Sequence, residues 1–188
     1  TYQYSLDGET WGSIEAVKYT DVTAETITVY VKASAEGYED KVEHGTVKIT
    51  PATITVKAVN NSKTYGEDDP ALVYTAGDGV NGEAPSFSGN VERVPGESVR
   101  KYDILQGSLK LADGDDGKFK KDNYVIEYTK GEFEIVKNGG MQLVVDDYTG
   151  VYDGDAHTVT PRATAGGNQV TYQYSLDGET WGSIEAVK

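Results

Sequence analysis

The 188-residue sequence contains no cysteine, one methionine and two histidines. Without cysteine, neither a disulfide framework nor a thiolate metal site is possible, and thiol chemistry does not indicate the compartment. No apolar run approaches the roughly 20 residues that a membrane-spanning helix needs, and no signal-peptide or lipidation pattern is present. We therefore expect no membrane insertion in this segment, and we expect targeting and anchoring segments to lie outside these residues.

Basic residues are also scarce. Lys and Arg number 17 against 31 Asp and Glu, which gives a formal charge of -14. Such acidity keeps a chain soluble and repels nucleic acid and anionic membrane surfaces, so neither is an expected partner.

Sequence patterns of catalysis are missing too. His44 and His157 lie outside any H-E-x-x-H pattern and beside no candidate nucleophile, and no G-x-S-x-G elbow, phosphate loop or dinucleotide fingerprint occurs. With 31 acidic residues, carboxylate pairs arise by chance and do not indicate a glycosidase. We expect no enzymatic activity, no catalytic residue and no cofactor, and we place both histidines on surface strands or turns.

An exact repeat is the strongest positive signal. The eighteen residues TYQYSLDGETWGSIEAVK at 1–18 recur unchanged at 171–188, which sets a period of 171 − 1 = 170 residues. An identical copy indicates recent duplication of a whole module, as in proteins built from tandem units. The chain is expected to span one repeat unit of a longer array.

Period-2 alternation of apolar and polar residues predicts an all-β chain. For example, Ile54 and Val56 alternate with Thr53, Thr55 and Lys57. Gly, Asp and Asn clusters that suit hairpin turns separate the segments. Strands are expected at 27–32, 46–49, 53–57, 71–74, 101–105, 124–128, 132–136, 142–145, 158–160 and 170–174.

These strands predict small antiparallel Ig-like β-sandwich domains in tandem. A β-grasp-like sheet is the alternative for the central module, and a long amphipathic helix would favour it. We expect no helix longer than about two turns, since no sustained 3.6-residue period occurs.

Two junctions divide the period. At Thr50-Pro51 one strand ends and another begins at once, and proline restricts both residues, so this joint is expected to be stiff. At Lys137-Asn138-Gly139-Gly140 two glycines predict a joint that bends more easily. The expected domains are therefore 51–137, complete, and a second type that begins at 141–188 and ends, by the repeat, with residues equivalent to 1–50.

The central module resembles a known family. The stretches TYGEDDPALVYT at 64–75, RVPGESVRKYDILQGSL at 93–109 and NYVIEYTKGEFEIVK at 123–137 look like the MBG domain of YGX type, which occurs in arrays on bacterial surface proteins. The other module, with VYDGDAHTVTP at 151–161 and VTYQYSLDGETW at 170–181, resembles the YDG-type and bacterial Ig-like repeats that accompany it.

The resemblance implies a secreted bacterial cell-surface adhesin whose non-catalytic repeats form a stalk that projects a distal binding region. One alternative is a binding module in which exposed Tyr and Trp contact glycans or a host ligand. A second is an accessory domain of an extracellular carbohydrate-active enzyme. Neighbouring repeats of the same protein are the expected partners in the first case.

Three turn motifs could bind a ligand, but structural roles are favoured. In Tyr65-Gly66 and Tyr152-Asp153-Gly154 the tyrosine enters a turn, where its ring can cover one end of a core and its hydroxyl can reach water. Ser5 to Trp11, repeated at Ser175 to Trp181, is one residue short of the Asp-box pattern of sialidase-like propellers. An Asp-Gly hairpin whose Trp packs back over the strands is favoured there, over an exposed ligand contact or a propeller blade.

The acidic turn at Asp113 to Asp122 resembles a calcium loop only in composition. Asn123 stands where an EF-hand loop has its Glu. A solvated hairpin tip is favoured, and Asp153 with Asp155 is a weaker case still, so no metal ligand is assigned. A Lys–Asn isopeptide link would suit small domains without disulfides, but the sequence identifies no pair.

The two incomplete modules predict an unusual contact. Residues 1–50 lack the first strands of their domain and 141–188 lack its last, so each should leave an apolar face in water. We expect the 1–50 segment of one molecule to pair with 141–170 of the next, head to tail, unless both belong to one continuous array.

Overall fold

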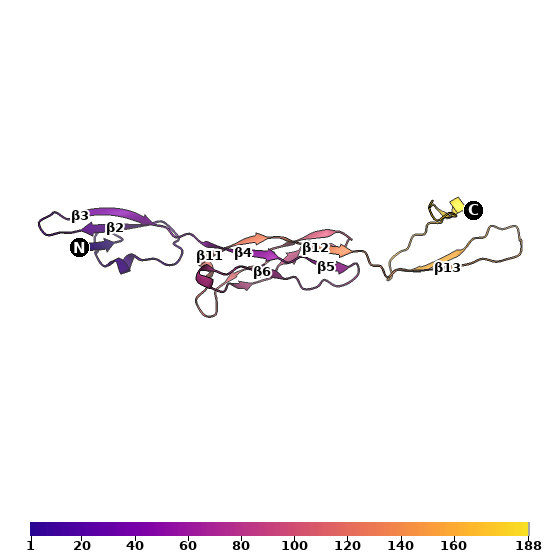
Figure 1. The fold of residues 1–188 in the computed structure, drawn as a ribbon, viewed down its shortest axis with the longest axis horizontal. Helices are drawn as coiled ribbons and strands as arrows, with labels where there is room; N and C mark the ends of the chain where they lie inside the picture. The colour runs from indigo at the N-terminus through magenta and orange to yellow at the C-terminus, as the bar shows by residue number, and fades with distance from the viewer. Residues whose placement is uncertain (188) are drawn as a thin grey trace. The chain divides into compact units, whose positions relative to one another are not determined.

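The computed structural model describes residues 1–187, with side chains to Glu185. Its strands are β1 Tyr2–Ser5, β2 Ile27–Ala33, β3 Lys41–Val47, β4 Ala52–Ala58, β5 Asn61–Thr64, β6 Tyr74–Ala76, β7 Ser86–Ser88, β8 Glu92–Arg93, β9 Lys101–Leu105, β10 Lys110–Ala112, β11 Tyr124–Thr129, β12 Gly131–Val136, β13 Gln142–Asp146 and β14 Thr160–Thr164. Four short 3-10 helices join them: η1 Ile14–Val17, η2 Val80–Gly82, η3 Lys121–Asn123 and η4 Ile184–Val187. Figure 1 shows their order along the chain.

The chain is all-β, as the alternation predicts. Residues 1–187 contain no α-helix, so the β-grasp alternative lacks the long helix that would favour it. None of the helices described is long or apolar enough to cross a bilayer.

Contacts divide the chain into two compact units. The first comprises Thr1–Lys63 with Asp68–Ile135, and the second comprises Thr64–Glu67 with the chain from Val136 onward. The turn at Thr64–Glu67 belongs to the second unit through backbone contact, because the amide of Tyr65 donates to the carbonyl of Val136 at 2.8 Å.

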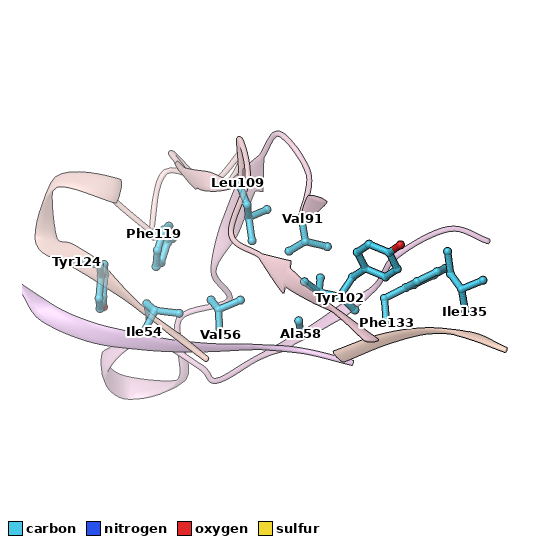
Figure 2. Close-up of a cluster of buried hydrophobic side chains, with 11 residues drawn as sticks. Ile54, Val56, Ala58, Val91, Tyr102, Leu109, Phe119, Tyr124, Phe133 and Ile135 are labelled. Atoms are coloured by element: carbon cyan, nitrogen blue, oxygen red, sulfur yellow. The ribbon is translucent and has the colours of Figure 1, made fainter. Parts of the chain in front are cut away.

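The stretch 52–136 forms three sheets with strand orders β11-β4-β6, β5-β12-β9-β8 and β10-β7. Burial alternates along β4, where Ile54 and Val56 are buried and Thr55 is exposed. Figure 2 shows Ile54, Val56 and Ala58 pointing from β4 toward Leu109 and Val91. The core cluster consists of Ile54, Val56, Ala58, Val91, Tyr102, Ile104, Leu109, Phe119, Tyr124, Phe133 and Ile135. Fully burying each large apolar side chain contributes about 1.5–3 kcal/mol, so this cluster stabilises the domain.

One pairing differs from the expectation of antiparallel strands throughout. β4 and β11 lie side by side and run parallel, with Ile54 opposite Ile126 (Figure 1). The other ladders whose register is known are antiparallel. A parallel pair needs a long return connection, which the strands between residues 58 and 124 supply. Alternation alone does not specify strand direction, so the sequence pattern could not reveal this pairing.

Residues 1–47 form a separate sheet with strand order β1-β2-β3. Its buried residues are few: Val17 and Val29 are the buried apolar side chains, and Ser5 and Thr23 the buried polar ones. Nearly every residue of β3 is exposed. The sheet therefore has little core of its own.

The chain after Val136 forms one hairpin, in which β13 and β14 pair from Gln142 opposite Thr164 to Asp146 opposite Thr160. The strand expected at 170–174 does not form; a single bridge joins Tyr174 to Gly182. In the first copy of the same sequence, residues 2–5 form β1 against β2. The same residues therefore form a strand in the first copy and a single bridge in the second.

Candidate functional site

The junction at Pro51 is held by a short segment, Asp21 to Ala24, that is bonded on both sides. On one side it is attached to the end of its own sheet. Lys48 Nζ donates to the carbonyls of Thr23 and Ala24 at 2.6 and 2.9 Å, and the Ile49 amide donates to Thr23 Oγ1 at 3.1 Å. This fixes the segment beside the chain that leads into β4.

On its other side the same segment is bonded to η3 of the central domain. The Val22 amide donates to Asn123 Oδ1 at 2.8 Å, and Asn123 Nδ2 donates to Asp21 Oδ1 at 2.8 Å. Lys120 Nζ lies 2.6 Å from the other oxygen of Asp21. These contacts, first from Lys120 and then from Asn123, lower the pKa of Asp21 from its usual value. Because one amide side chain both accepts and donates across the junction, it specifies the relative placement of the two segments.

Four charged side chains form a second cluster across the sheet β5-β12-β9-β8. Lys63 lies on β5 and Arg93 on β8, at the two edges of that sheet. Their side chains are only 5 and 8 % exposed. Lys63 Nζ lies 2.7 Å from Asp69 Oδ1 and 2.5 Å from Glu97 Oε2, and Arg93 contacts the same two carboxylates at 2.5 Å each. The guanidinium of Arg93 also lies 5.0 Å from the ring centre of Phe133.

The charges of this cluster balance, since two cations share two carboxylates. Hydrogen bonding from Arg93 lowers the pKa of Asp69 to about 2 despite its partial desolvation, and Lys63 adds to the effect. The same contacts raise the pKa of Lys63, with Asp69 as the larger cause. A carboxylate held ionised and a lysine held protonated are a poor acid and a poor nucleophile at neutral pH. The cluster ties two loops together across the sheet, and the pattern of the sequence alone did not single it out.

The repeated Ser-Leu-Asp-Gly turn has the same bonds in both copies. Asp7 Oδ1 accepts from the amides of Glu9 and Thr10 at 2.8 and 2.7 Å and from the hydroxyl of Ser5 at 2.7 Å. In the second copy, Asp177 accepts from the equivalent three donors at 2.8 Å each. The Thr10 amide, then Ser5, hold the pKa of Asp7 far below its usual value. The carboxylate is thus committed to shaping the turn.

The tryptophans after these turns differ in environment. Trp11 packs back over the sheet as expected, with Lys32 Nζ of β2 4.7 Å from its ring centre. Trp181, in the second copy, is 57 % exposed. Sequence identity therefore fixes the turn but not the packing of the ring beyond it.

The two tyrosine turns also differ. Gly66 and Gly154 both have positive φ, +91° and +87°, as tight turns require. Tyr65 is 37 % exposed, whereas Tyr152 is 95 % exposed. The expectation that the Tyr152 ring covers the end of a core is thus wrong, because the ring is almost fully exposed.

The remaining candidates lie at the surface. His44 on β3 and His157, which lies in the irregular segment before β14, are both exposed. His157 Nε2 lies 2.9 Å from Asp153 Oδ1, and its ring stacks on Tyr148 at 4.1 Å.

The acidic turn is held by internal contacts. Asp113 accepts from the amide and the ammonium of Lys121 at 3.0 and 2.9 Å. Within residues 1–187 no group of three or more potential metal-ligating side chains converges. That the acidic turn is a solvated hairpin tip without a bound metal ion stays a prediction.

Residues 54–134 match the family model of the MBG domain, YGX type. The match covers the three sheets and the charge cluster but less than half of the chain. No curated protein and no solved structure matches the chain.

Proposed function

We propose that the chain is a non-catalytic spacer segment in the tandem-repeat region of a secreted bacterial surface adhesin, where it projects a distal binding region. MBG domains are typical of extracellular repeat regions of surface proteins, which supports the location. The exact 170-residue period supports an array in which such domains alternate with a second, YDG-type or Ig-like repeat. The proposal assigns no catalytic residue and no cofactor.

The bonded junction at Pro51 is the observation that carries this proposal. A spacer needs joints whose stiffness is set by the sequence. Here the side-chain amide of Asn123 holds the junction, because its oxygen accepts from the Val22 amide and its nitrogen donates to Asp21. The sequence Asn138-Gly139-Gly140 leaves the other junction with more backbone freedom. Alternating stiff and flexible joints would set the reach and bending of the array.

Single-molecule energy transfer tests this proposal directly. Because the chain has no cysteine, dyes can be placed on introduced cysteines at Glu36 and Lys57 without background labelling. We expect a narrow distance distribution across Pro51, and a broader one for a pair that spans residues 138–140. Asp21→Ala combined with Asn123→Ala should broaden the first distribution.

Asp122→Ala is the matched control, since it removes a side chain beside Asn123 that is not bonded to Asp21. It should leave the distribution narrow. Equal breadth at the two junctions, or no response to the double variant, would contradict the spacer role.

Glycan binding is a second candidate because two exposed tyrosines share a shallow hollow. Tyr2 is 71 % exposed and Tyr38 is 81 % exposed, and both line a depression with Ala33 and Gly37. Aromatic rings with a free face suit stacking on sugars. A specific glycan-array signal that Tyr38→Ala abolishes would support binding, whereas no specific signal would favour the spacer.

A further inference from the structure

The sequence contains two Asn-Gly pairs, Asn81-Gly82 and Asn138-Gly139. An asparagine followed by glycine is chemically labile, because the glycine amide nitrogen can attack the side-chain carbonyl carbon and no Cβ hinders its approach. The residues of both pairs are exposed, so water reaches each of them. Exposure therefore does not distinguish the two pairs, whereas the hydrogen bonds around them do.

At Asn138 the side chain is held in a conformation that suits this attack. Its Oδ1 accepts from the amide of Gly140 at 2.8 Å, and its Nδ2 donates to the carbonyl of Tyr65 at 3.2 Å. The small ring closed by the first bond contains both Cγ of Asn138 and the amide nitrogen of Gly139, so the reacting atoms are kept near each other. Within the described residues the Gly139 amide donates no hydrogen bond, so its nitrogen is available.

The Gly140 amide also activates the carbonyl that is attacked. Negative charge develops on Oδ1 as the new bond forms, and a donor already aimed at that oxygen stabilises this charge. The contact of Nδ2 with Tyr65 fixes the orientation of the carboxamide, because it keeps the nitrogen on the side away from Gly140. One turn thus supplies both the nucleophile and the donor.

The pair Asn81-Gly82 has the opposite arrangement. Its nucleophile is engaged, since the amide of Gly82 donates to the carbonyl of Gly79 at 3.2 Å. The amide of Glu83, which corresponds in sequence to that of Gly140, donates to the carbonyl of Val80 at 3.2 Å and not to the Asn81 side chain. Both features that favour attack at Asn138 are therefore missing at Asn81.

We propose that Asn138 is a site of spontaneous modification, at which the chain converts its own asparagine into aspartate and isoaspartate. The Gly139 nitrogen loses its proton to hydroxide and bonds to Cγ of Asn138. The Cγ–Nδ2 bond breaks, and ammonia leaves with a proton from water, so that a cyclic succinimide remains. Water that adds to Cγ breaks its bond to the Gly139 nitrogen and gives aspartate. Water that adds to the main-chain carbonyl breaks the other bond and gives isoaspartate, in which the backbone runs through the former side chain.

The modification changes the junction that follows β12. Both products lose the bond from Nδ2 to the Tyr65 carbonyl, and a carboxylate there repels that oxygen. Tyr65 keeps the bond from its amide to the carbonyl of Val136 at 2.8 Å. Isoaspartate also adds a methylene to the main chain. The inference rests on the contacts of Asn138 and does not depend on the spacer role.

Peptide mass spectrometry of the full chain, incubated in mildly alkaline buffer, tests the proposal. Conversion is followed as the mass gain when an amide becomes a carboxyl, and chromatography separates the two products. We expect Asn138 to convert faster than Asn81, by about two- to tenfold for each hydrogen bond that distinguishes them. In guanidinium chloride the two rates should become similar, because these bonds are lost. Equal rates in the folded chain, or a ratio that survives unfolding, would overturn the proposal.

Two proline variants test the role of the turn. Gly140→Pro removes the amide that donates to Oδ1 and should slow conversion at Asn138 by about two- to tenfold, with Asn81 unaffected. Met141→Pro is the matched control, because it adds the same ring one residue later and keeps the Gly140 amide, so it should convert like the wild type. Wild-type conversion in Gly140→Pro, or equal slowing by both prolines, would also contradict the proposal.

Discussion

Arg93 Nε lies 2.5 Å from Oδ2 of Asp69, while Oδ1 of the same carboxylate accepts from Lys63. Asp69 thus connects cations from the two edges of one sheet. Removing one partner of a buried charged pair is usually costly because the other charge stays behind without compensation.

This arrangement predicts a specific acid response. The pKa of Asp69 is about 2 in the folded protein, against an ordinary value of 3.8 for an aspartate carboxyl. A lowered folded pKa means that the stabilisation is present above 3.8 and is lost as pH falls toward about 2. Asp69→Asn should lower the unfolding free energy at neutral pH and flatten its decline through that window, measured by urea unfolding. Asp68→Asn removes the same charge one residue away and should keep the wild-type slope; equal slopes in all three proteins would refute the assignment.

The two tryptophans offer a comparison within one molecule. Trp181→Phe leaves Trp11 as the reporter, and Trp11→Phe leaves Trp181. We expect emission from Trp11 at shorter wavelength and weaker quenching by acrylamide, since Trp181 is 57 % exposed. Identical quenching of the two reporters would show that β2 does not shield the first copy.

Calcium should not change the thermal stability of the protein. Asp113 is bonded to Lys121, so a cation would have to displace that ammonium. A site at 100 times its dissociation constant would add about 2.7 kcal/mol of stability. We expect equal melting temperatures in calcium and in chelator by calorimetry, and a rise of several degrees with calcium would establish a site in the acidic turn.

Gly89 is expected to be the most sensitive turn glycine of the central domain. Its φ is +79°, and an added Cβ would lie 2.2 Å from the carbonyl oxygen of Ser108. Gly117 has φ +69° and no atom within 4 Å, so it reports the backbone effect alone. Gly117→Ala should cost about 1–2 kcal/mol, and Gly89→Ala about 1–3 kcal/mol more, by denaturant unfolding. Equal stability losses in the two variants would show that the Ser108 carbonyl does not lie against Gly89.

Local pattern predicted much of the fold because local chemistry determines it. The strand expected at 101–105 forms over those residues, and Ile54 and Val56 are buried as the alternation requires. The Ser5 to Thr10 turn forms twice with the same bonds, since its donors and acceptors all lie within a few residues. Such features can be predicted because they depend on residues that are close together in the sequence.

Non-local features were harder to predict. Lys63 and Arg93 are thirty residues apart in the sequence, and no spacing rule indicates that two loop carboxylates will join them. The strand β5 that carries Lys63 was not expected, because the polar segment Asn61–Thr64 shows no alternation. Residues 170–174 carry a strand-like sequence but form no strand, whereas the identical residues of the first copy pair with β2. In each case the deciding contact lies far along the chain.

The parallel pairing of β4 and β11 affects how the domain responds to mechanical force. β4 is the first strand of the central domain, and β11 leads within two residues into its last strand, β12. A tensile force on the two ends of this domain therefore pulls these neighbours in opposite directions along their length. Their ladder, from Tyr124 opposite Ala52 to Thr129 opposite Lys57, is then sheared as a whole and not unzipped bond by bond. Forced unfolding follows the unfolding barrier, so this geometry raises the force at which the domain yields.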